Sequence, residues 1–216
     1  MLRLSLEAKA TVKIGLFSRG GKQRLRRQAL DHDFEPDQTM TPFGILLPQY
    51  DELFLYFTGS SVTSDFMVDM LESCWQSIRP SFPEVDTLVI NQDNGPENQS
   101  HRTQFMKRII AFGAQHQLFI RLAYYPPYHS KYNGIERCWG VLENHWNGDV
   151  LDTVETALRF AASMTWNGKH PQVQLITKSY PKGIRLTAKE MKELETQIER
   201  LPRLKRWFVD IPHRLV

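Results

Sequence analysis

The spacing of hydrophobic and polar positions predicts β-strands in the first quarter of the chain. Leucine alternates with polar residues over 2–7, which is typical of a strand with one buried face. Two short apolar runs follow at 45–48 and 53–57, and the polar residues 50–52 separate them. This pattern is consistent with a hairpin, so we expect three consecutive antiparallel strands.

The hydrophobic period then changes to that of helices alternating with strands. Apolar residues at helical spacing predict helices over 63–79 and 103–115, and a third helix that begins near Ile135. Short apolar runs at 87–92 and 118–124 lie between these helices and predict strands. The middle of the chain is therefore predicted to alternate regularly between helix and strand.

The order of the elements indicates the fold class. Three meander strands followed by alternating helices and strands predict an α/β fold, namely a ribonuclease-H-like mixed five-stranded sheet with helices on both faces. Further helices are predicted over 153–166 and 188–200, each opened by a capping-box-like pair. We expect residues 1–170 to form the ribonuclease-H-like core and residues 171–216 to form a C-terminal helical extension packed on it.

The composition indicates where the protein is located more than what it does. The 216 residues are 41% hydrophobic, and no apolar run approaches the ~18 residues of a membrane span, so we expect no membrane partner. The N-terminus lacks an apolar signal sequence, and Cys74 and Cys138 have no metal-ligand spacing. A reduced cytoplasmic location, bacterial and nucleoid-associated, is expected. The net charge of +3 permits a nucleic-acid partner without requiring one.

Basic residues gather in two stretches. The first surrounds Gly20 and Gly21, where a flexible loop can bring cations close to phosphates, although a solvated surface loop is the commoner role. Its cations are Arg19, Lys22, Arg24, Arg26 and Arg27. The second stretch precedes Trp207 and Phe208, and we expect these aromatics to pack a terminal helix rather than to stack on bases. Its cations are Arg200, Arg203, Lys205 and Arg206.

Three acidic residues stand at the ends of predicted elements. Asp93 follows the strand 87–92, and α/β sheets place ligands at the carboxyl ends of their strands. Asn94-Gly95 would then form a tight turn, and turn chemistry alone also explains this tripeptide. Glu136 lies in the first turn of the third helix, where the helix dipole favours a carboxylate. Glu7 ends the first strand, on the face opposite the leucines.

Together the three carboxylates suit the chemistry of two divalent metal ions. Such ions lie roughly 3.5–4 Å apart and need several carboxylates that converge from different elements. Magnesium prefers oxygen ligands. One ion would activate an attacking water or 3′-hydroxyl, and the other would stabilise the leaving oxygen of a phosphoryl transfer. Glu143 shares the polar face of Glu136, and we interpret it as a solvated surface residue.

Other catalytic schemes lack their residues in this sequence. There is no His-Glu-x-x-His pair, no Gly-x-Ser-x-Gly turn and no Walker-type phosphate loop. His129 lies in the loop before the third helix, where it could contact substrate, but a structural hydrogen bond is the commoner role for such a residue. The acidic residues therefore remain the best catalytic candidates.

Two segments resemble those of DDE transposases and retroviral-type integrases. Residues 86–95 resemble the second catalytic strand, and residues 124–140 resemble the proline-bearing loop and Asn-x-Ile-Glu helix of the third acidic residue. Glu136 follows Asp93 by 43 residues, near the spacing of that superfamily. A further resemblance, to ISAzo-type transposases of bacterial insertion sequences, covers nearly the whole chain through residues 4–10, 17–22, 144–148 and 166–171.

The resemblance implies a DDE-type polynucleotidyl transferase, a transposase that cuts and joins DNA with two Mg²⁺ or Mn²⁺ ions. It assigns Glu7, Asp93 and Glu136 as catalytic residues and metal ligands. DNA, as transposon ends and as target, would be the partner, and a homo-oligomer is expected on it. The expected DNA-binding residues are Arg19, Lys22, Arg24, Arg26, Arg27, His129 and Lys131.

Two departures from the family pattern leave alternatives open. The first catalytic position is normally Asp, and Glu7 would shift the carboxylate by roughly one ångström, which can cost about a hundredfold in rate. Relatives also carry an upstream helical DNA-binding region, so we expect this copy to be truncated at its N-terminus. One alternative is a catalytically impaired DNA-binding or assembly remnant, which Glu7→Asp would rescue if the defect is local. The other is a ribonuclease-H-like nuclease that cuts without joining.

Overall fold

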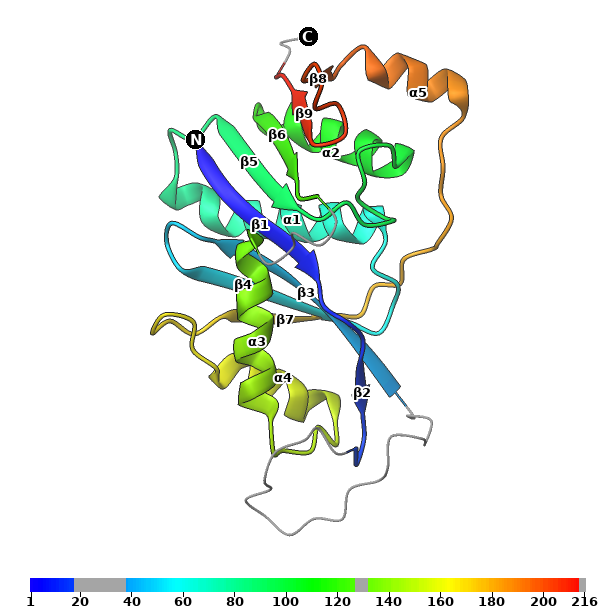
Figure 1. Cartoon of the computed structure of the whole chain (residues 1–216). Helices are drawn as coiled ribbons and strands as arrows, with labels where there is room; N and C mark the ends of the chain where they lie inside the picture. Colours follow the sequence, from blue (N-terminus) through cyan, green and yellow to red (C-terminus); the bar gives the residue numbers. More distant parts are fainter. Residues whose placement is uncertain (18–37, 127–131, 214–216) are drawn as a thin grey trace.

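Strand β1 lies in the middle of a large mixed sheet in this computed structural model, which describes residues 1–17, 38–126 and 132–213 (Figure 1). The strands are β1 (Leu2–Ala8), β2 (Val12–Ile14), β3 (Gln38–Leu47), β4 (Glu52–Thr58), β5 (Thr87–Gln92), β6 (Phe119–Tyr124), β7 (Gln172–Ile176), β8 (Glu199–Arg200) and β9 (Phe208–Ile211). Their order across the sheet is β7-β4-β3-β1-β5-β6-β9-β8, and β2 pairs with β3.

The five central strands match the predicted mixed sheet. β3 and β4 form the predicted hairpin, with Asp51 in the left-handed region at a φ of 53° in the turn between them. β1 pairs with β3 in antiparallel orientation and with β5 in parallel orientation, and β5 pairs in parallel with β6. Parallel neighbours have their carboxyl ends at one edge of the sheet, and that edge is where the candidate residues lie.

Helices cover both faces of the sheet. They are α1 (Ser64–Ile78), the short 3₁₀ helix η1 (Arg79–Ser81), α2 (Thr103–His116), α3 (Gly134–Trp146), α4 (Val154–Ser163) and α5 (Ala188–Glu195). α1 and α2 pack on one face, whereas α3 and α4 cover the β3–β4 half of the other face (Figure 1). The helices thus bury the continuous apolar runs of β3 and β4 from both sides.

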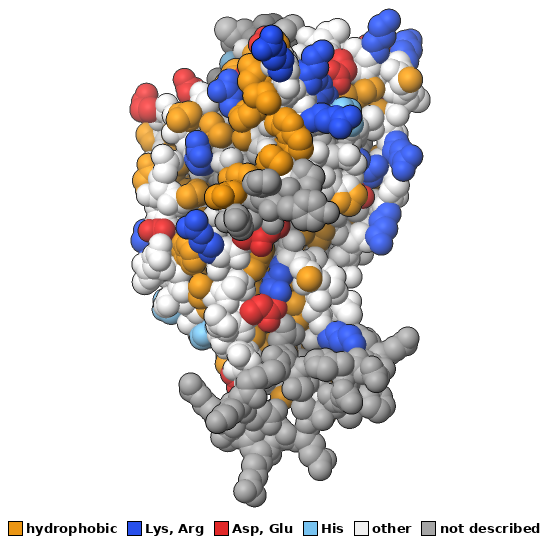
Figure 2. Space-filling model, viewed as in Figure 1, with side chains coloured by type: hydrophobic (Ala, Val, Ile, Leu, Met, Phe, Trp, Pro, Cys, Tyr) orange, Lys and Arg blue, Asp and Glu red, His pale blue; other side chains and the backbone are white. Residues whose placement is uncertain are grey.

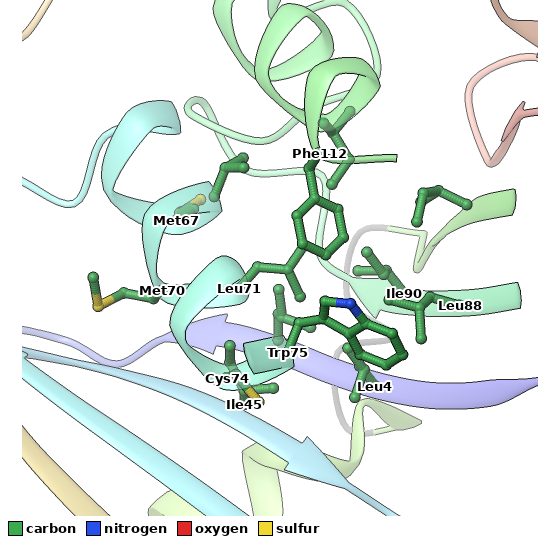
Figure 3. Close-up of a cluster of buried hydrophobic side chains, with 14 of the residues drawn as sticks. Leu4, Ile45, Met67, Met70, Leu71, Cys74, Trp75, Leu88, Ile90 and Phe112 are labelled. Atoms are coloured by element: carbon green, nitrogen blue, oxygen red, sulfur yellow. The ribbon is translucent and has the colours of Figure 1, made fainter. Parts of the chain in front are cut away.

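The larger core lies between α1, α2 and the sheet. Figure 3 shows Leu71 and Trp75 of α1 directed toward Leu4 of β1 and Ile90 of β5, with Phe112 of α2 beside them. All of these side chains are almost completely buried. Burial of this apolar area is the main favourable contribution to folding, and it holds β1 and β5 in a fixed register.

The second core lies beneath α3. The predicted stripe of Ile135, Trp139, Leu142 and Trp146 is buried against β3, β4 and α4. Its spacing of four, three and four residues places all four side chains on one face of the helix. The opposite face, which carries Glu136, is left free of the apolar core.

The C-terminal region differs from the prediction. The helix expected over 188–200 ends at Glu195, and Glu199–Arg200 instead form β8, which pairs with β9. Trp207 packs against the main core, whereas Phe208 begins strand β9 beside β6. The pairing of β9 with β6 joins residues far apart in the sequence, so local periodicity could not reveal it.

Two further predictions of secondary structure differ in part from the structure. The helix predicted over 153–166 ends at Ser163, and Asn167 and Gly168 adopt positive φ in a turn that bridges Trp166 and Lys169. In the described part of 171–216, α5 is the single helix, and β7 and β9 extend the sheet at opposite sides. A domain boundary at residue 170 stays a prediction. Among the described helices, none combines the length and the apolar character that crossing a membrane requires.

Candidate active site

The three candidate carboxylates come from elements that meet at one edge of the sheet. Leu6 of β1 pairs with Gln92 of β5, so Glu7 and Asp93 are the next residues along two parallel neighbours. Glu136 lies in the first turn of α3, which crosses in front of β1 and β3 (Figure 1). Figure 2 shows acidic side chains near the middle of this face. The topology thus brings together residues 129 positions apart in the sequence.

A buried polar contact fixes the start of α3 on β1. The Ser5 hydroxyl donates a short hydrogen bond to Oδ1 of Asn133 and accepts one from the amide of Ile135 at 3.1 Å. Asn133 in turn donates from Nδ2 to the carbonyl of Leu6 at 3.2 Å. Asn133 is the N-cap residue but forms no capping bond with its own side chain, so Ser5 satisfies the helix amide from another element.

Close backbone packing keeps α3 against β3. Gly44 is the cross-strand partner of Glu7. A Cβ atom at Gly44 would lie 2.6 Å from Cδ1 of Ile135 and 2.7 Å from Cη2 of Trp139. Real Cβ atoms do not approach other carbons this closely, so the absent side chain lets α3 lie directly over the strand. The helix turn that carries Glu136 is held next to Glu7 as a result.

The electrostatics of Glu7 reflect the approach of the other two acids. Burial, a hydrogen-bond contact with Glu136 and the negative charges of Glu136 and Asp93 raise the pKa of Glu7 to about 9. The indole of Trp139 opposes this rise, although its Nε1 forms no hydrogen bond of normal geometry within the described part of the chain. Oε2 of Glu7 is buried and has no hydrogen-bond partner among the described residues. This cluster is therefore short of positive charge.

Asp93 is oriented by the loop that follows β5. Nδ2 of Asn98 donates to Oδ1 of Asp93 and to Oε1 of Gln92, both at 3.1 Å. The Tyr124 hydroxyl at the end of β6 donates to the carbonyl of Asn98 at 2.9 Å. The turn expected at Asn94-Gly95 begins at Gly95 instead, whose carbonyl accepts from Gln99 at 2.9 Å. The carboxylate is thus held at the sheet edge by its own loop.

The matching family model is described as the Rhodopirellula transposase DDE domain and spans residues 2–212. This chain belongs to that DDE transposase family. The predicted resemblance to DDE transposases is thereby confirmed.

A solved structure agrees on the fold of this DDE transposase domain. The chain is similar to the structure titled Mos1 transposase paired-end complex with left transposon end, with a TM-score of 0.53 and 9% identity. The match covers 73% of this chain and 46% of that chain, so it extends over less than half of the other protein. At this identity the likeness supports the ribonuclease-H-like fold, which is confirmed. No curated protein matches the sequence.

The donor atoms of the site fit divalent metal ions in their chemistry. Glu7, Asp93 and Glu136 offer carboxylate oxygens, which Mg²⁺ and Mn²⁺ prefer. The unpartnered Oε2 of Glu7 and its raised pKa mark a place where a bound cation would offset repulsion. Among the described residues, no group of three or more His, Cys, Asp or Glu already forms a closed metal-binding cluster.

The other residues singled out from the sequence are Glu143 and the predicted DNA-binding residues. Glu143 was interpreted as a solvated residue, and it is partly exposed but forms an ion pair with Lys9. The predicted DNA-binding residues lie outside the described residues, and they are Arg19, Lys22, Arg24, Arg26, Arg27, His129 and Lys131. Sequence reasoning missed the roles of Ser5, Asn98 and Asn133. The one feature of the sequence that could have indicated these roles is Ser5, a polar residue on the face of the first strand opposite the leucines.

Proposed function

We propose that this DDE transposase domain catalyses metal-dependent cleavage and strand transfer of DNA at the ends of a mobile element. The observation that carries the proposal is the convergence of Glu7, Asp93 and Glu136 at the carboxyl edge of β1 and β5. Phosphoryl transfer requires little covalent chemistry from the protein and depends on positioning and charge stabilisation. Three convergent carboxylates at this edge would hold the divalent ions in position, and those ions would supply the positive charge.

The three carboxylates would hold two Mg²⁺ or Mn²⁺ ions. When bound, such ions activate the attacking hydroxyl and stabilise the leaving oxygen. The chain's own residues prepare the site: Ser5 fixes the first turn of α3, and Asn98 fixes Oδ1 of Asp93. Outer residues that orient the ligands affect metal affinity almost as strongly as the ligands themselves.

Glu7 takes the position that is usually Asp, and we propose that it serves as a ligand. Its longer side chain reaches from β1 to Glu136 on α3. Gly44 beside it lets the helix approach the sheet, and this close approach supports the role of Glu7 as a ligand. Activity of this copy is therefore part of the proposal, and the impaired-remnant alternative is tested by Glu7→Asp.

DNA is the proposed substrate and partner. The structural neighbour is titled a Mos1 transposase paired-end complex with the left transposon end, which supports a DNA end as substrate. An oligomer as the working form stays a prediction. The basic residues around Gly20 and those at 129–131 are proposed contacts to that DNA. A cytoplasmic location stays a prediction.

Calorimetric titration of Mn²⁺ tests the metal site. We expect binding by the unchanged chain, loss of binding in Asp93→Asn, and full binding in the control Glu193→Gln on the exposed helix α5. Unchanged binding by Asp93→Asn would contradict the assignment.

A plasmid that carries the gene with its native flanking DNA tests the reaction. Mn²⁺-dependent nicks at fixed positions, followed by joined products, are expected. Nicks at scattered positions without joining would favour the ribonuclease-H-like nuclease instead.

A further inference from the structure

The loop between β8 and β9, residues 201–207, carries charge that the catalytic cluster does not use. It contains three cations, Arg203, Lys205 and Arg206, and no acidic residue. We propose that this β8–β9 loop is a phosphate-binding surface that holds duplex DNA against the catalytic edge. The inference deepens the proposed function and rests on it for the identity of the DNA substrate.

The loop lies at the same edge of the sheet as the catalytic residues. The amide of Tyr124, at the end of β6, donates to the carbonyl of Trp207 at 2.8 Å. Tyr124 also pairs with Gln92, which precedes Asp93. Strands in a sheet are ~4.8 Å apart, so the end of the loop lies about 10 Å from Gln92 along the sheet edge. That separation is smaller than the width of a DNA duplex, so one duplex could contact both places.

Hydrogen bonds fix the loop to the segment that carries Asp93. Nη2 of Arg200 donates to the carbonyl of Ser100 at 2.9 Å and pairs with Oε1 of Glu195 at 2.8 Å. Within the loop, the amide of Trp207 donates to the carbonyl of Leu204 at 2.8 Å. A surface that is ordered before binding loses less conformational entropy when DNA binds.

The cations of the loop are exposed and available to a ligand. Arg203, Lys205 and Arg206 form no ion pair with any residue that the structure describes, whereas Arg200 and Arg121 are each paired with an acid. Figure 2 shows Lys and Arg side chains gathered along the top of this face, where α5, β8 and β9 lie in Figure 1. Unpaired cations near a catalytic edge are suited to phosphates, whose contacts dominate the affinity for DNA.

The backbone of Arg203 gives a second indication. Its φ is 66°, in the left-handed region that Gly and Asn adopt with less strain than Arg. The chain therefore makes a tight turn at Arg203, and the exposed side chain is displayed at this turn.

DNA is favoured over a protein partner by this placement, since the loop neighbours the residues that would act on DNA. Leu201 and Leu204 are 45% and 40% exposed, so a contact between copies of the chain is an alternative outcome. Sedimentation of the loop variant decides this point, because loss of self-association without any change in DNA binding would overturn the proposal.

The test measures binding of a fluorescein-labelled duplex of arbitrary sequence by anisotropy, in EDTA and over a range of NaCl concentrations. The loop variant combines Arg203→Gln, Lys205→Gln and Arg206→Gln. The control removes the same charge from exposed lysines on α2 and α5, through Lys107→Gln, Lys189→Gln and Lys192→Gln. A conservative variant, Arg203→Lys with Arg206→Lys, retains the charge.

For the loop variant we expect at least tenfold weaker binding at low salt. The slope of log affinity against log salt should fall by about 2–3, because each phosphate contact contributes roughly 0.9. For the control variant, the salt slope should fall by less than the value of one phosphate contact. The Lys variant should retain most of the affinity for DNA. Equal losses in the loop variant and the control would overturn the proposal, and so would a wild-type chain that binds no duplex.

Mn²⁺ calorimetry separates failure of the loop from failure of the proposed function. The loop variant should bind Mn²⁺ and melt like the unchanged chain, which excludes misfolding. If Asp93→Asn binds metal unchanged while DNA binding still depends on the loop, the proposed catalysis fails and the loop remains a DNA-binding site.

Discussion

The hydroxyl of Ser5 on the first strand accepts a 3.1 Å hydrogen bond from the amide of Ile135, the residue before Glu136. A residue of β1 therefore caps the helix that carries one candidate ligand, two positions away from another candidate, Glu7. Helix caps usually come from the residue just before the helix. Here the cap comes from the sheet, and it couples the position of Glu136 directly to that of Glu7.

Ser5→Ala should weaken both the fold and the metal site. It removes the cap and leaves Oδ1 of Asn133 buried without its donor, which should lower the free energy of unfolding by about 1–3 kcal/mol. Mn²⁺ affinity should fall about tenfold or more, because outer contacts orient the ligands. Chemical denaturation and calorimetry measure the two effects.

Thr153→Ala is the matched control for the Ser5 variant. Thr153 caps α4 by accepting from the amide of Thr156 at 3.1 Å, but α4 carries no candidate ligand. We expect a loss of about 1 kcal/mol in stability and no change in Mn²⁺ affinity. If both variants changed metal affinity equally, the cap from Ser5 would have no specific role at the site.

Gly44→Ala should destabilise the protein by about 1–3 kcal/mol, because its Cβ would overlap Ile135 and Trp139. Gly140→Ala is the control in α3, since a Cβ there meets no atom of the described residues within 4 Å and alanine favours a helix. That variant should gain up to about 1 kcal/mol. Thermal denaturation of both variants measures the difference, and a neutral Gly44→Ala would show that α3 can move away from β3.

The fold was predictable where periodicity is local. The apolar stripe from Ile135 to Trp146 and the leucines of the first strand have regular spacing, and each lies where it was expected. The first half of β3 was missed, because Pro42 and a run of polar residues argue against a strand. Only the pairing of β3 with β2 and β4 in the structure shows that this strand accommodates Pro42.

The acidic residues of the site could be predicted from the sequence, but the residues that position them could not. Asp93 and Glu136 stand beside recognisable element ends, so their chemistry can be read from sequence. The contact between Ser5 and Asn133 joins residues 128 positions apart, and no local pattern indicates it. The same is true of β8 and β9, which form only because β6 offers a free edge.

Asp69 should give the stability of the fold a specific dependence on acid. Burial alone would raise the pKa of its carboxyl, but hydrogen bonds from Lys178, Arg108 and Tyr180 outweigh burial and lower it. A carboxyl with a lowered pKa stabilises the fold above its unfolded-state pKa, and the contribution is lost as pH falls through the folded-state pKa. Acid therefore weakens the connection between α1, α2 and the segment before α5.

Asp69→Asn tests this connection by thermal melts over a range of pH. At neutral pH we expect a Tm lower by roughly 2–4 °C, equivalent to about 1 kcal/mol for a chain of this size. The difference from the unchanged chain should shrink as pH falls below the ordinary value of 3.8. Glu193→Gln on exposed α5 should have the Tm of the unchanged chain at every pH. If the plots of Tm against pH for Asp69→Asn and the unchanged chain were parallel, the ion pairs of Asp69 would make no contribution to the pH dependence.

Glu7→Gln should stabilise the metal-free protein while it removes metal binding. The raised pKa means that Glu7 must take up a proton when the chain folds at neutral pH, and the neutral amide of Gln avoids that cost while it can still donate to Glu136. In EDTA at neutral pH we expect a higher Tm, with about 2–4 °C for each kcal/mol of stability gained. Lower stability of this variant in EDTA would contradict this prediction, because it would show that Glu7 stabilises the metal-free fold.

Glu7→Asp decides whether this position is adapted or damaged. If Glu7 is a ligand in a site built around its length, shortening the side chain moves the carboxylate away from Glu136 by roughly one ångström, and DNA cleavage should fall by about a hundredfold. Mn²⁺ binding should weaken as well, while the melting temperature changes little. The impaired-remnant alternative predicts the reverse, a gain of metal binding and of cleavage. Because the two hypotheses differ in sign, calorimetry on this one variant separates them even before the DNA ends are known.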